Sequence, residues 1–191
     1  DLHLHQAPLE AVVQEAAEPH VNRGKILLFD TFSLAEDDPA QPLVLRRPEV
    51  IHGLRNLIQN AVDFAGGTVW IETTWSATQI AVRIMDDGKG YPPHLIGRIG
   101  DPFMRRRREL GERKHRPGYE GMGLGLFIAK TLLERTGAEL SFANGRDPQL
   151  REVTDPQCCG AVVEVIWPRH KIESVLAAGS AALGPNQPLE V

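Results

Sequence analysis

The chain has 191 residues, of which 42% are hydrophobic and 24% charged, and its formal net charge is −4. This composition is that of one globular domain, and the mild negative charge gives no general attraction to nucleic acid or to a membrane surface. The only two cysteines, Cys158 and Cys159, are adjacent, which excludes a disulfide framework and favours a reducing compartment. No apolar run approaches the ~20 residues of a membrane span, and no signal-peptide pattern opens the chain. Because the first residue is Asp, we expect a fragment of a longer protein.

The first half of the chain predicts helices and strands in alternation. Residues 1–7 are expected to be a loose lead-in, and apolar residues at helical spacing then predict a helix that Pro8 opens. The further elements expected in this half are a buried strand at 25–31, a short strand at 42–46, a helix at 48–65 and a hairpin of strands at 68–74 and 79–85.

The second half predicts a long loop between shorter elements. Residues 100–120 are rich in glycine, proline and arginine and are interpreted as a mobile loop. The other expected elements are short helices at 92–99 and near 171–178, a helix at 122–135, and strands at 138–144 and 161–167. This order predicts an α+β fold: a mixed sheet of about five strands with about three helices on one face. We expect the domain to cover residues 1–170, followed by a weakly structured tail at 171–191.

The helix expected at 48–65 carries two stripes. One is apolar and suits a core, whereas the other is polar, with spacings of four, four and three: His52, Asn56, Asn60 and Asp63. Two amides one turn apart offer neutral oxygens at a fixed separation, and such oxygens are hard ligands suited to Mg²⁺. Taken alone, the polar stripe is more typical of a solvated helix face.

An aspartate-glycine turn, Asp86-Asp87-Gly88-Lys89-Gly90, follows the strand at 79–85. A carboxylate at the end of a strand can accept a hydrogen bond from the exocyclic amine of adenine, which guanine lacks at that position. Gly88 and Gly90 allow the backbone to approach a base closely. Taken alone, the motif is more typical of an ordinary turn.

A glycine-rich stretch, Gly121-Met-Gly123-Leu-Gly125-Leu126, runs directly into the helix expected at 122–135. Glycines at a helix N-terminus expose backbone N–H groups to an anion, which is an arrangement that binds phosphate. The stretch is not a P-loop, because no Lys-Ser/Thr follows, and its glycine spacing differs from that of a dinucleotide-binding fold.

Together, in this order, these three stretches resemble the N, G1 and G2 boxes of the Bergerat-fold ATP-binding domains of gyrase, Hsp90, MutL and the sensor histidine kinases. Phe103 stands where the histidine kinases carry their F box. The resemblance covers roughly the first 170 residues and implies a two-layer α/β sandwich that binds ATP and Mg²⁺. Within the superfamily, the stretches around Asn60 and Gly123 look closest to the redox-responsive Reg/Prr sensor kinases.

The resemblance also implies a role for individual residues. Asn60 would be the Mg²⁺ ligand, Asn56 its catalytic neighbour at the phosphates, and Asp86 the residue that binds the adenine amine. The segment 100–120 would be a lid over the phosphates, with Arg105 or Arg106 in contact with them. The complete set of expected nucleotide-binding residues is Asn56, Asn60, Asp63, Phe64, Asp86, Gly88, Gly90, Phe103, Arg105, Arg106, Gly121, Gly123, Leu124, Gly125 and Leu126.

Two positions bear on the reaction. Gyrase-like ATPases carry a glutamate where this chain has Asn56, and an amide cannot take a proton from water at neutral pH. This favours phosphoryl transfer to another nucleophile over hydrolysis. Asp63 departs from the family pattern, because many histidine kinases have Lys or Arg there, so its role at ATP is left open.

We therefore expect the catalytic domain of a protein-histidine kinase. It would pass the γ-phosphoryl of ATP to a histidine on a separate dimerisation domain, for relay to a response regulator, without contacting nucleic acid. The chain lacks a phosphoacceptor motif, so that histidine should lie elsewhere in a protein anchored in the inner membrane, with this domain in the cytoplasm. Two alternatives remain open: a gyrase- or Hsp90-like ATPase switch, and a module that holds nucleotide or docks a partner without transfer.

Overall fold

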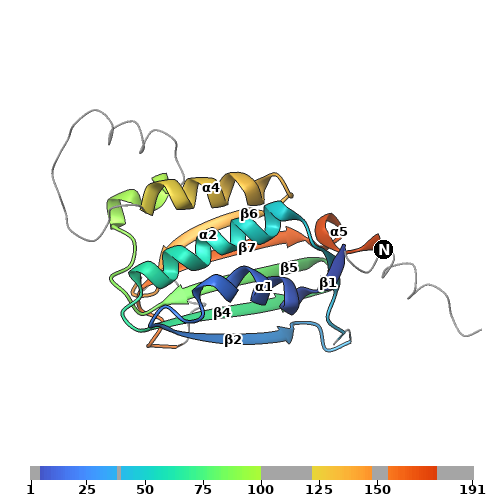
Figure 1. Cartoon of the computed structure of the whole chain (residues 1–191), viewed down its shortest axis with the longest axis horizontal. Coiled ribbons are helices and arrows are strands. Elements are labelled where there is room, and N and C mark those ends of the chain that lie inside the picture. Colours follow the sequence, from blue (N-terminus) through green and yellow to red (C-terminus); the bar gives the residue numbers. More distant parts are fainter. Residues whose placement is uncertain (1–4, 38–39, 100–121, 148–154, 176–191) are drawn as a thin grey trace, which may run out of the picture.

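The computed structural model describes residues 5–37, 40–99, 122–147 and 155–175. Its main feature is a five-stranded sheet with the strand order β2-β4-β5-β7-β6 (Figure 1). The strands are β2 (Ile26–Ser33), β4 (Thr68–Trp75), β5 (Gln79–Asp86), β6 (Glu139–Asn144) and β7 (Ala161–Pro168). β2 runs parallel to β4, and every other neighbouring pair is antiparallel. The mixed sheet expected from the sequence is therefore confirmed.

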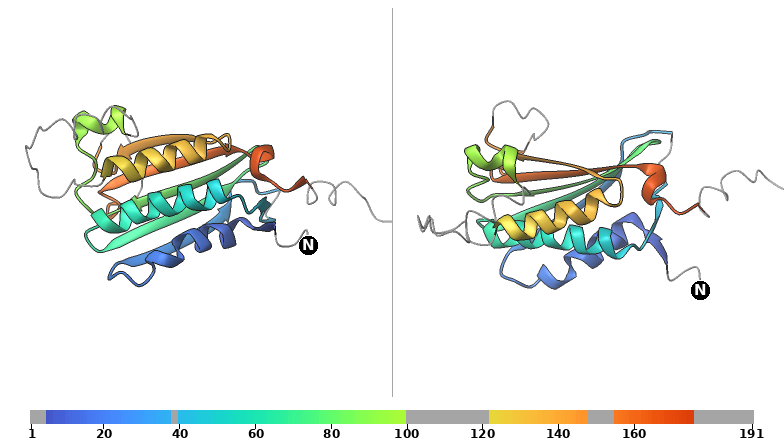
Figure 2. Two further views of the ribbon diagram at one scale, coloured as in Figure 1. Left: turned by 45° about the horizontal axis from the view of Figure 1, so that its top comes forward. Right: turned by 90° about the horizontal axis from the view of Figure 1, so that it is seen from above.

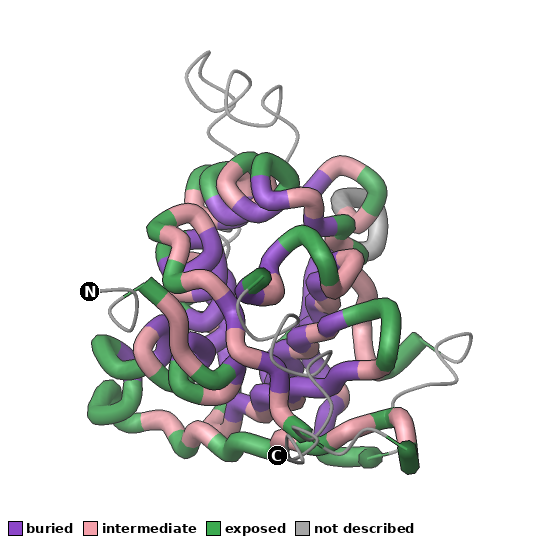
Figure 3. The backbone as a smooth tube through the Cα atoms, turned by 90° about the vertical axis from the view of Figure 1, so that its right-hand side faces the viewer, coloured by how far each residue is buried: buried purple, intermediate pink, exposed green. Residues whose placement is uncertain are grey.

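Three helices form a second layer on one face of this sheet (Figure 2). They are α1 (Leu9–Ala17), α2 (Pro48–Phe64) and α4 (Met122–Glu134). α2 lies between the other two and packs against both, because its apolar stripe, which includes Leu54, Leu57 and Ile58, is buried. The expected two-layer α+β sandwich is confirmed, and its buried residues gather between the helices and the sheet (Figure 3).

A smaller sheet joins the two ends of the described chain. Its strands, β1 (Gln6–Pro8) and β3 (Leu43–Leu45), pair antiparallel and stay apart from the main sheet. The expectation of a loose lead-in over residues 1–7 is thus wrong for Gln6 and Ala7, because a three-residue strand leaves no periodicity to detect. After α5 (Arg169–Ile172), Glu173 bridges to β3 and the Ser174 hydroxyl donates to Gln6 Oε1. The first residues of the segment interpreted as a tail therefore contact the domain.

Two 3₁₀ helices complete the described elements. η2 (Glu18–His20) follows α1, and η3 (Pro93–Arg98) occupies the place where a short helix was expected at 92–99. The helix expected at 122–135 is present as α4, and Gly137 adopts φ +90° just beyond its end. The predicted loop at 100–120 and the tail beyond Val175 lie outside the described residues.

Candidate functional site

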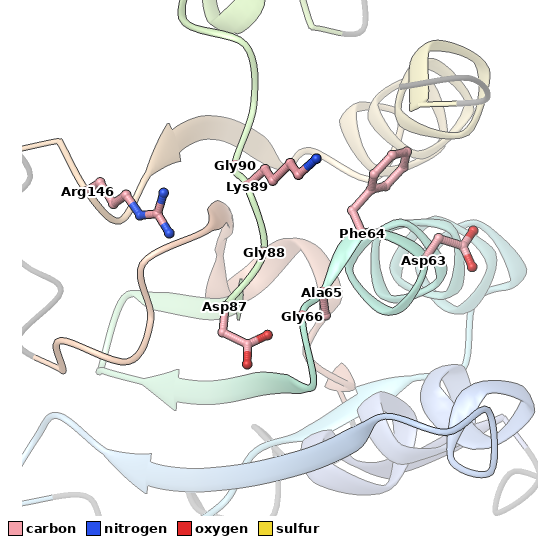
Figure 4. A pocket seen from close by; sticks show the side chains of 9 residues that line it. All are labelled: Asp63, Phe64, Ala65, Gly66, Asp87, Gly88, Lys89, Gly90 and Arg146. Carbon is pink, nitrogen blue, oxygen red and sulfur yellow. The ribbon is translucent and has the colours of Figure 1, made fainter. Parts of the chain in front are cut away.

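Two adjoining hollows lie at the end of α2. The first, of about 420 Å³, is bounded by the end of α2 and by the turn that follows β5 (Figure 4). It is lined by Asp63, Phe64, Ala65, Gly66, Asp87, Gly88, Lys89, Gly90 and Arg146. The second, of about 370 Å³, lies between α2 and the start of α4 and is lined by Asn56, Gln59, Asn60, Asp63, Leu124, Gly125 and Ile128. Asp63 belongs to both, so the two hollows share a wall, and all three sequence motifs meet there.

The two asparagines of α2 face the second hollow. Asn56 donates its Nδ2 hydrogen to the carbonyl of His52 at 3.0 Å, which leaves its side-chain oxygen as the atom available to a ligand. Asn60 is 9% exposed, and its amide makes no hydrogen bond to any residue that the structure describes. A nearly buried amide at the wall of a hollow, with no hydrogen-bond partner among the described residues, fits a ligand such as a hydrated Mg²⁺ ion.

Asp86 does not line the first hollow directly but is bonded to Gly88, which does. The residue is 1% exposed, and its Oδ1 accepts the backbone N–H groups of Gly88 at 2.8 Å and Ala161 at 3.1 Å. Both bonds go to Oδ1, so Oδ2 takes part in neither of them. Burial raises the pKa of Asp86 from 3.8 to about 6, although the two backbone donors and Lys25 lower it. The carboxylate is therefore ionised, and able to accept a hydrogen bond, at neutral pH.

Asp87 fixes the same turn from the other side. Its carboxylate accepts the backbone N–H groups of Gly67 at 2.9 Å and Thr68 at 3.0 Å. Burial alone would raise the pKa of Asp87, but the hydrogen bonds from these backbone groups outweigh it and hold the pKa below its usual range. Asp87 therefore ties the turn to the loop between α2 and β4, a role that the sequence did not reveal.

Both glycines of this turn are required by close contacts with neighbouring atoms. A Cβ on Gly88 would stand 2.1 Å from the carbonyl oxygen of Phe64, and Gly90 adopts φ +77° against the side chain of Asn144. Asn144 also clamps the next residue: it accepts the N–H of Tyr91 at 2.6 Å and donates to the carbonyl of Tyr91 at 2.7 Å. The turn after β5 is thereby held rigidly in place by β6.

The glycines in the first turn of α4, in contrast, have open space beside them. A Cβ on Gly123 or Gly125 would meet nothing within 4 Å, so neither glycine is required by packing among the described residues. Gly125 and Leu124 line the second hollow, whereas Leu126 is buried in the core. Open space beside glycines at a helix N-terminus fits a bulky anion such as phosphate.

Several residues at the hollows were not predicted. Arg146 lines the first hollow, and its guanidinium lies 3.6 Å from the sulfur of Cys159. Arg23 is paired with Asp63 at 2.7 Å, and Lys25 donates to the carbonyl of Ala65. These cations come from loops distant in sequence, and no local pattern marks them.

Four predicted site residues cannot be placed. Phe103, Arg105, Arg106 and Gly121 lie outside the described residues.

Within the parts of the chain that the structure describes, no group of three His, Cys, Asp or Glu residues could hold a metal ion, and no helix has the length and apolarity needed to cross a bilayer.

The comparisons with known proteins identify the family. Residues 46–171 match the family of histidine kinase-, DNA gyrase B-, and HSP90-like ATPases. The chain belongs to this family and, within it, to the catalytic domains of sensor histidine kinases. The resemblance drawn from the three motifs is thereby confirmed.

Three relatives in sequence are named sensor histidine kinases. Two proteins named sensor histidine kinase RegB, both from Cereibacter sphaeroides, are 62% and 61% identical to this chain over 186 residues. The matched segment is 97% of this chain but only 40% of each RegB sequence. Sensor histidine kinase GtrS from Pseudomonas aeruginosa is 28% identical over 79% of this chain, and the match covers 29% of GtrS.

Solved structures support the fold. The mycobacterial sensor histidine kinase MprB has a TM-score of 0.59 at 21% identity, covering 86% of this chain and 97% of that one. The catalytic domain of histidine kinase ThkA, in a nucleotide-free form, has a TM-score of 0.58 at 20% identity, covering 85% and 94%. At these identities, the likeness bears on the fold alone.

Proposed function

We propose that this domain binds ATP with Mg²⁺ and donates the γ-phosphoryl group to a histidine on a separate dimerisation domain, for relay to an aspartate of a response regulator. The observation that carries the proposal is the pair of adjoining hollows, one lined by a turn that is bonded to a buried carboxylate and the other flanked by two asparagines and a glycine-rich helix start. Because the two hollows adjoin, a nucleotide can place its base in the first and its polyphosphate in the second.

The first hollow would hold the adenine. Oδ2 of Asp86 would accept a hydrogen bond from the exocyclic amine, while Gly88 and Gly90 let the backbone approach the base. Phe64 offers an aromatic face on the wall of the same hollow (Figure 4). A guanine would present a keto oxygen to the carboxylate, which explains the expected selectivity.

The second hollow would hold the phosphates and the metal ion. Asn60 and Asn56 would supply neutral oxygens to Mg²⁺ and its water shell, and the backbone of Gly125 would face the phosphates. Bound Mg²⁺ would neutralise charge that develops on the phosphates during transfer. Positioning by these residues, together with Phe103, Arg105, Arg106 and Gly121 from outside the described parts, would supply most of the catalysis.

The lining of the second hollow favours transfer over hydrolysis. Among its described residues, Asp63 alone carries a carboxylate, and that carboxylate is engaged by Arg23 at 2.7 Å. No other described group there could take a proton from water at neutral pH, since Asn56, Gln59 and Asn60 are amides. A nucleophile activated on another domain therefore suits this site better than a bound water does.

The partners follow from the same proposal. The phosphoacceptor histidine and the dimerising helices would belong to the remainder of the protein, since this chain spans about 40% of the length of its RegB relatives. A domain that uses ATP and a response regulator would work on the cytoplasmic side of a membrane-anchored protein.

Titration calorimetry of the domain with ATP and with GTP, with and without Mg²⁺, tests the binding step. We expect micromolar-range, Mg²⁺-dependent binding of ATP but not of GTP, weakened at least tenfold in Asn60→Asp. Gln14→Ala, which removes an exposed amide from α1, is the control and should bind as the native domain does. Absence of binding by the native domain would contradict the proposal.

Transfer is tested by adding labelled ATP and a separately purified phosphoacceptor domain from a RegB-like kinase. We expect label on the phosphoacceptor domain only when both domains are present, and slow release of free phosphate without it. Rapid phosphate release by this domain alone would instead favour an ATPase switch. Tight ATP binding without transfer would favour a module that only holds nucleotide.

A further inference from the structure

Asp63 lines both hollows, and its carboxylate points away from Asp87 and Lys89 on the far side of the first hollow (Figure 4). If a nucleotide occupies them, as the proposed function requires, its polyphosphate must pass close to this carboxylate. Like charges only a few ångströms apart repel one another by an amount that costs measurable affinity, even when water screens them. The position therefore calls for a neutralising partner.

Arg23 is that partner, and it comes from a different part of the chain. It lies between η2 and β2, forty residues before Asp63, and its Nη2 donates to Asp63 Oδ1 at 2.7 Å. The two side chains are 43% and 37% exposed, so the pair adds little to the free energy of unfolding. Its effect should appear in the local electrostatics of the hollows.

The guanidinium is held from its other side as well. Its Nη1 lies 3.2 Å from Nδ1 of His20, a residue that is only 6% exposed. Burial and the neighbouring Arg23 lower the pKa of His20, so the ring is neutral at pH 7 and Nδ1 can accept this hydrogen bond. Lys25 lies two residues after Arg23, and its Nζ donates to the carbonyl of Ala65. This bond attaches the segment that carries Arg23 to the end of α2. Arg23 is thus a fixed cation rather than a freely moving one.

We propose that Arg23 is a positioning residue for the polyphosphate of the bound nucleotide, acting by neutralising Asp63 on the wall shared by the two hollows. His20 and Asp63 hold the guanidinium between them, and the pair replaces a repulsive carboxylate by a neutral, hydrogen-bonded unit. Arg23 therefore raises affinity for ligands that carry several phosphates and has little effect on adenosine, which carries none.

Calorimetric titration of Mg²⁺·ATP and of adenosine into four variants tests this inference. We expect Arg23→Ala to weaken ATP binding about five- to tenfold at low ionic strength, a penalty that shrinks in ~1 M salt, with adenosine binding unchanged. Arg23→Lys keeps the charge and should stay within about twofold of native. Arg46→Ala is the matched control, because Arg46 forms a similarly exposed ion pair, with Glu15 at 2.7 Å, away from the hollows.

The decisive variant is the double substitution Arg23→Ala with Asp63→Asn. Removing both charges should restore native ATP affinity within about twofold, whereas loss of a structural support would not be rescued. A failure to rescue, or an unchanged affinity in Arg23→Ala, would overturn the inference while native binding still upholds the proposed function. Failure of the native domain and of Arg46→Ala to bind Mg²⁺·ATP would overturn both.

Discussion

The carboxylate of Asp86, at the end of β5, accepts the backbone N–H of Ala161, the first residue of β7, at 3.1 Å. The neighbouring Gly160 adds a second bond in the same direction, because its backbone N–H donates to the carbonyl of Asp86 at 2.8 Å. The side chain proposed to bind adenine is therefore oriented by a strand that lies 75 residues further along the chain. A Cβ on Gly160 would stand 2.1 Å from Asp86 Oδ1, so this approach is possible only for glycine.

This arrangement separates the role of Asp86 in binding from its role in folding. In Asp86→Asn, the side-chain oxygen can still accept from Gly88 and Ala161, but the amide that replaces Oδ2 cannot accept a hydrogen bond from an adenine amine. We expect ATP affinity to fall at least tenfold in calorimetry while the domain stays folded. Asp30→Asn, on the exposed strand β2, should leave affinity unchanged. Native affinity in Asp86→Asn would mean that this carboxylate does not bind the base.

The raised pKa of Asp86 predicts an unusual dependence of stability on pH. Its pKa is about 6 in the folded protein against 3.8 ordinarily, so between these values the folded chain binds more protons than the unfolded chain. The contribution of Asp86 to the free energy of unfolding therefore falls as pH rises from about 4 to about 6, and is constant above. At pH 7 the loss amounts to at most roughly 3 kcal/mol.

The measurement is urea unfolding of native protein and Asp86→Asn across this range. Because the amide does not titrate, the variant should gain stability relative to native protein as pH rises from about 4 to 6, with no further change to pH 8. Parallel curves for the two proteins would show that Asp86 titrates normally in the fold.

Gly125 offers a way to separate ligand contact from packing. A Cβ there meets nothing within 4 Å, and alanine is a better helix former than glycine by roughly 1 kcal/mol. Gly125→Ala should therefore unfold at higher urea concentration than native protein, and yet bind Mg²⁺·ATP more weakly because the methyl group occupies phosphate space. Thr131→Ala, on the exposed side of the same helix, should not weaken binding. Stronger or equal ATP binding in Gly125→Ala would place the phosphates elsewhere.

The clamp between Asn144 and Tyr91 predicts a different coupling, in which stability and affinity fall together. Asn144→Ala removes both hydrogen bonds to the Tyr91 backbone, which are worth about 1–3 kcal/mol together. The turn containing Gly88 and Gly90 would loosen, so we expect ATP affinity to drop severalfold along with the free energy of unfolding. Ser141→Ala, exposed on the same strand, is the control. Unchanged affinity in a destabilised Asn144→Ala would show that the turn keeps its shape without the clamp.

The sequence predicted those parts of the molecule that are encoded locally. The helix carrying Asn56 and Asn60, the hairpin ending at Asp86 and the glycine-rich start of α4 all have short-range patterns, and the structure brings them together at one end of α2. Arg23, Asn144 and Ala161 could not be predicted, because each acts through a partner 40 to 75 residues away. The strand β1 was missed for a related reason: its three residues are strand only because β3 pairs with them.

The crossing of α2 and α4 sets the geometry of the second hollow, and it depends on Gly53. A Cβ on Gly53 would stand 2.5 Å from Cγ of Leu133, which is fully buried. Gly53→Ala should therefore destabilise the domain by about 1–3 kcal/mol and weaken ATP binding, because relief of the clash requires α4 to move. Leu133→Ala alone should cost about 2–5 kcal/mol through the cavity that it leaves. In the double variant, the new methyl group occupies part of that cavity, so urea unfolding should show a loss at least 1 kcal/mol smaller than the sum of the two single losses. Additive losses would mean that the helices relax apart without contact at this pair.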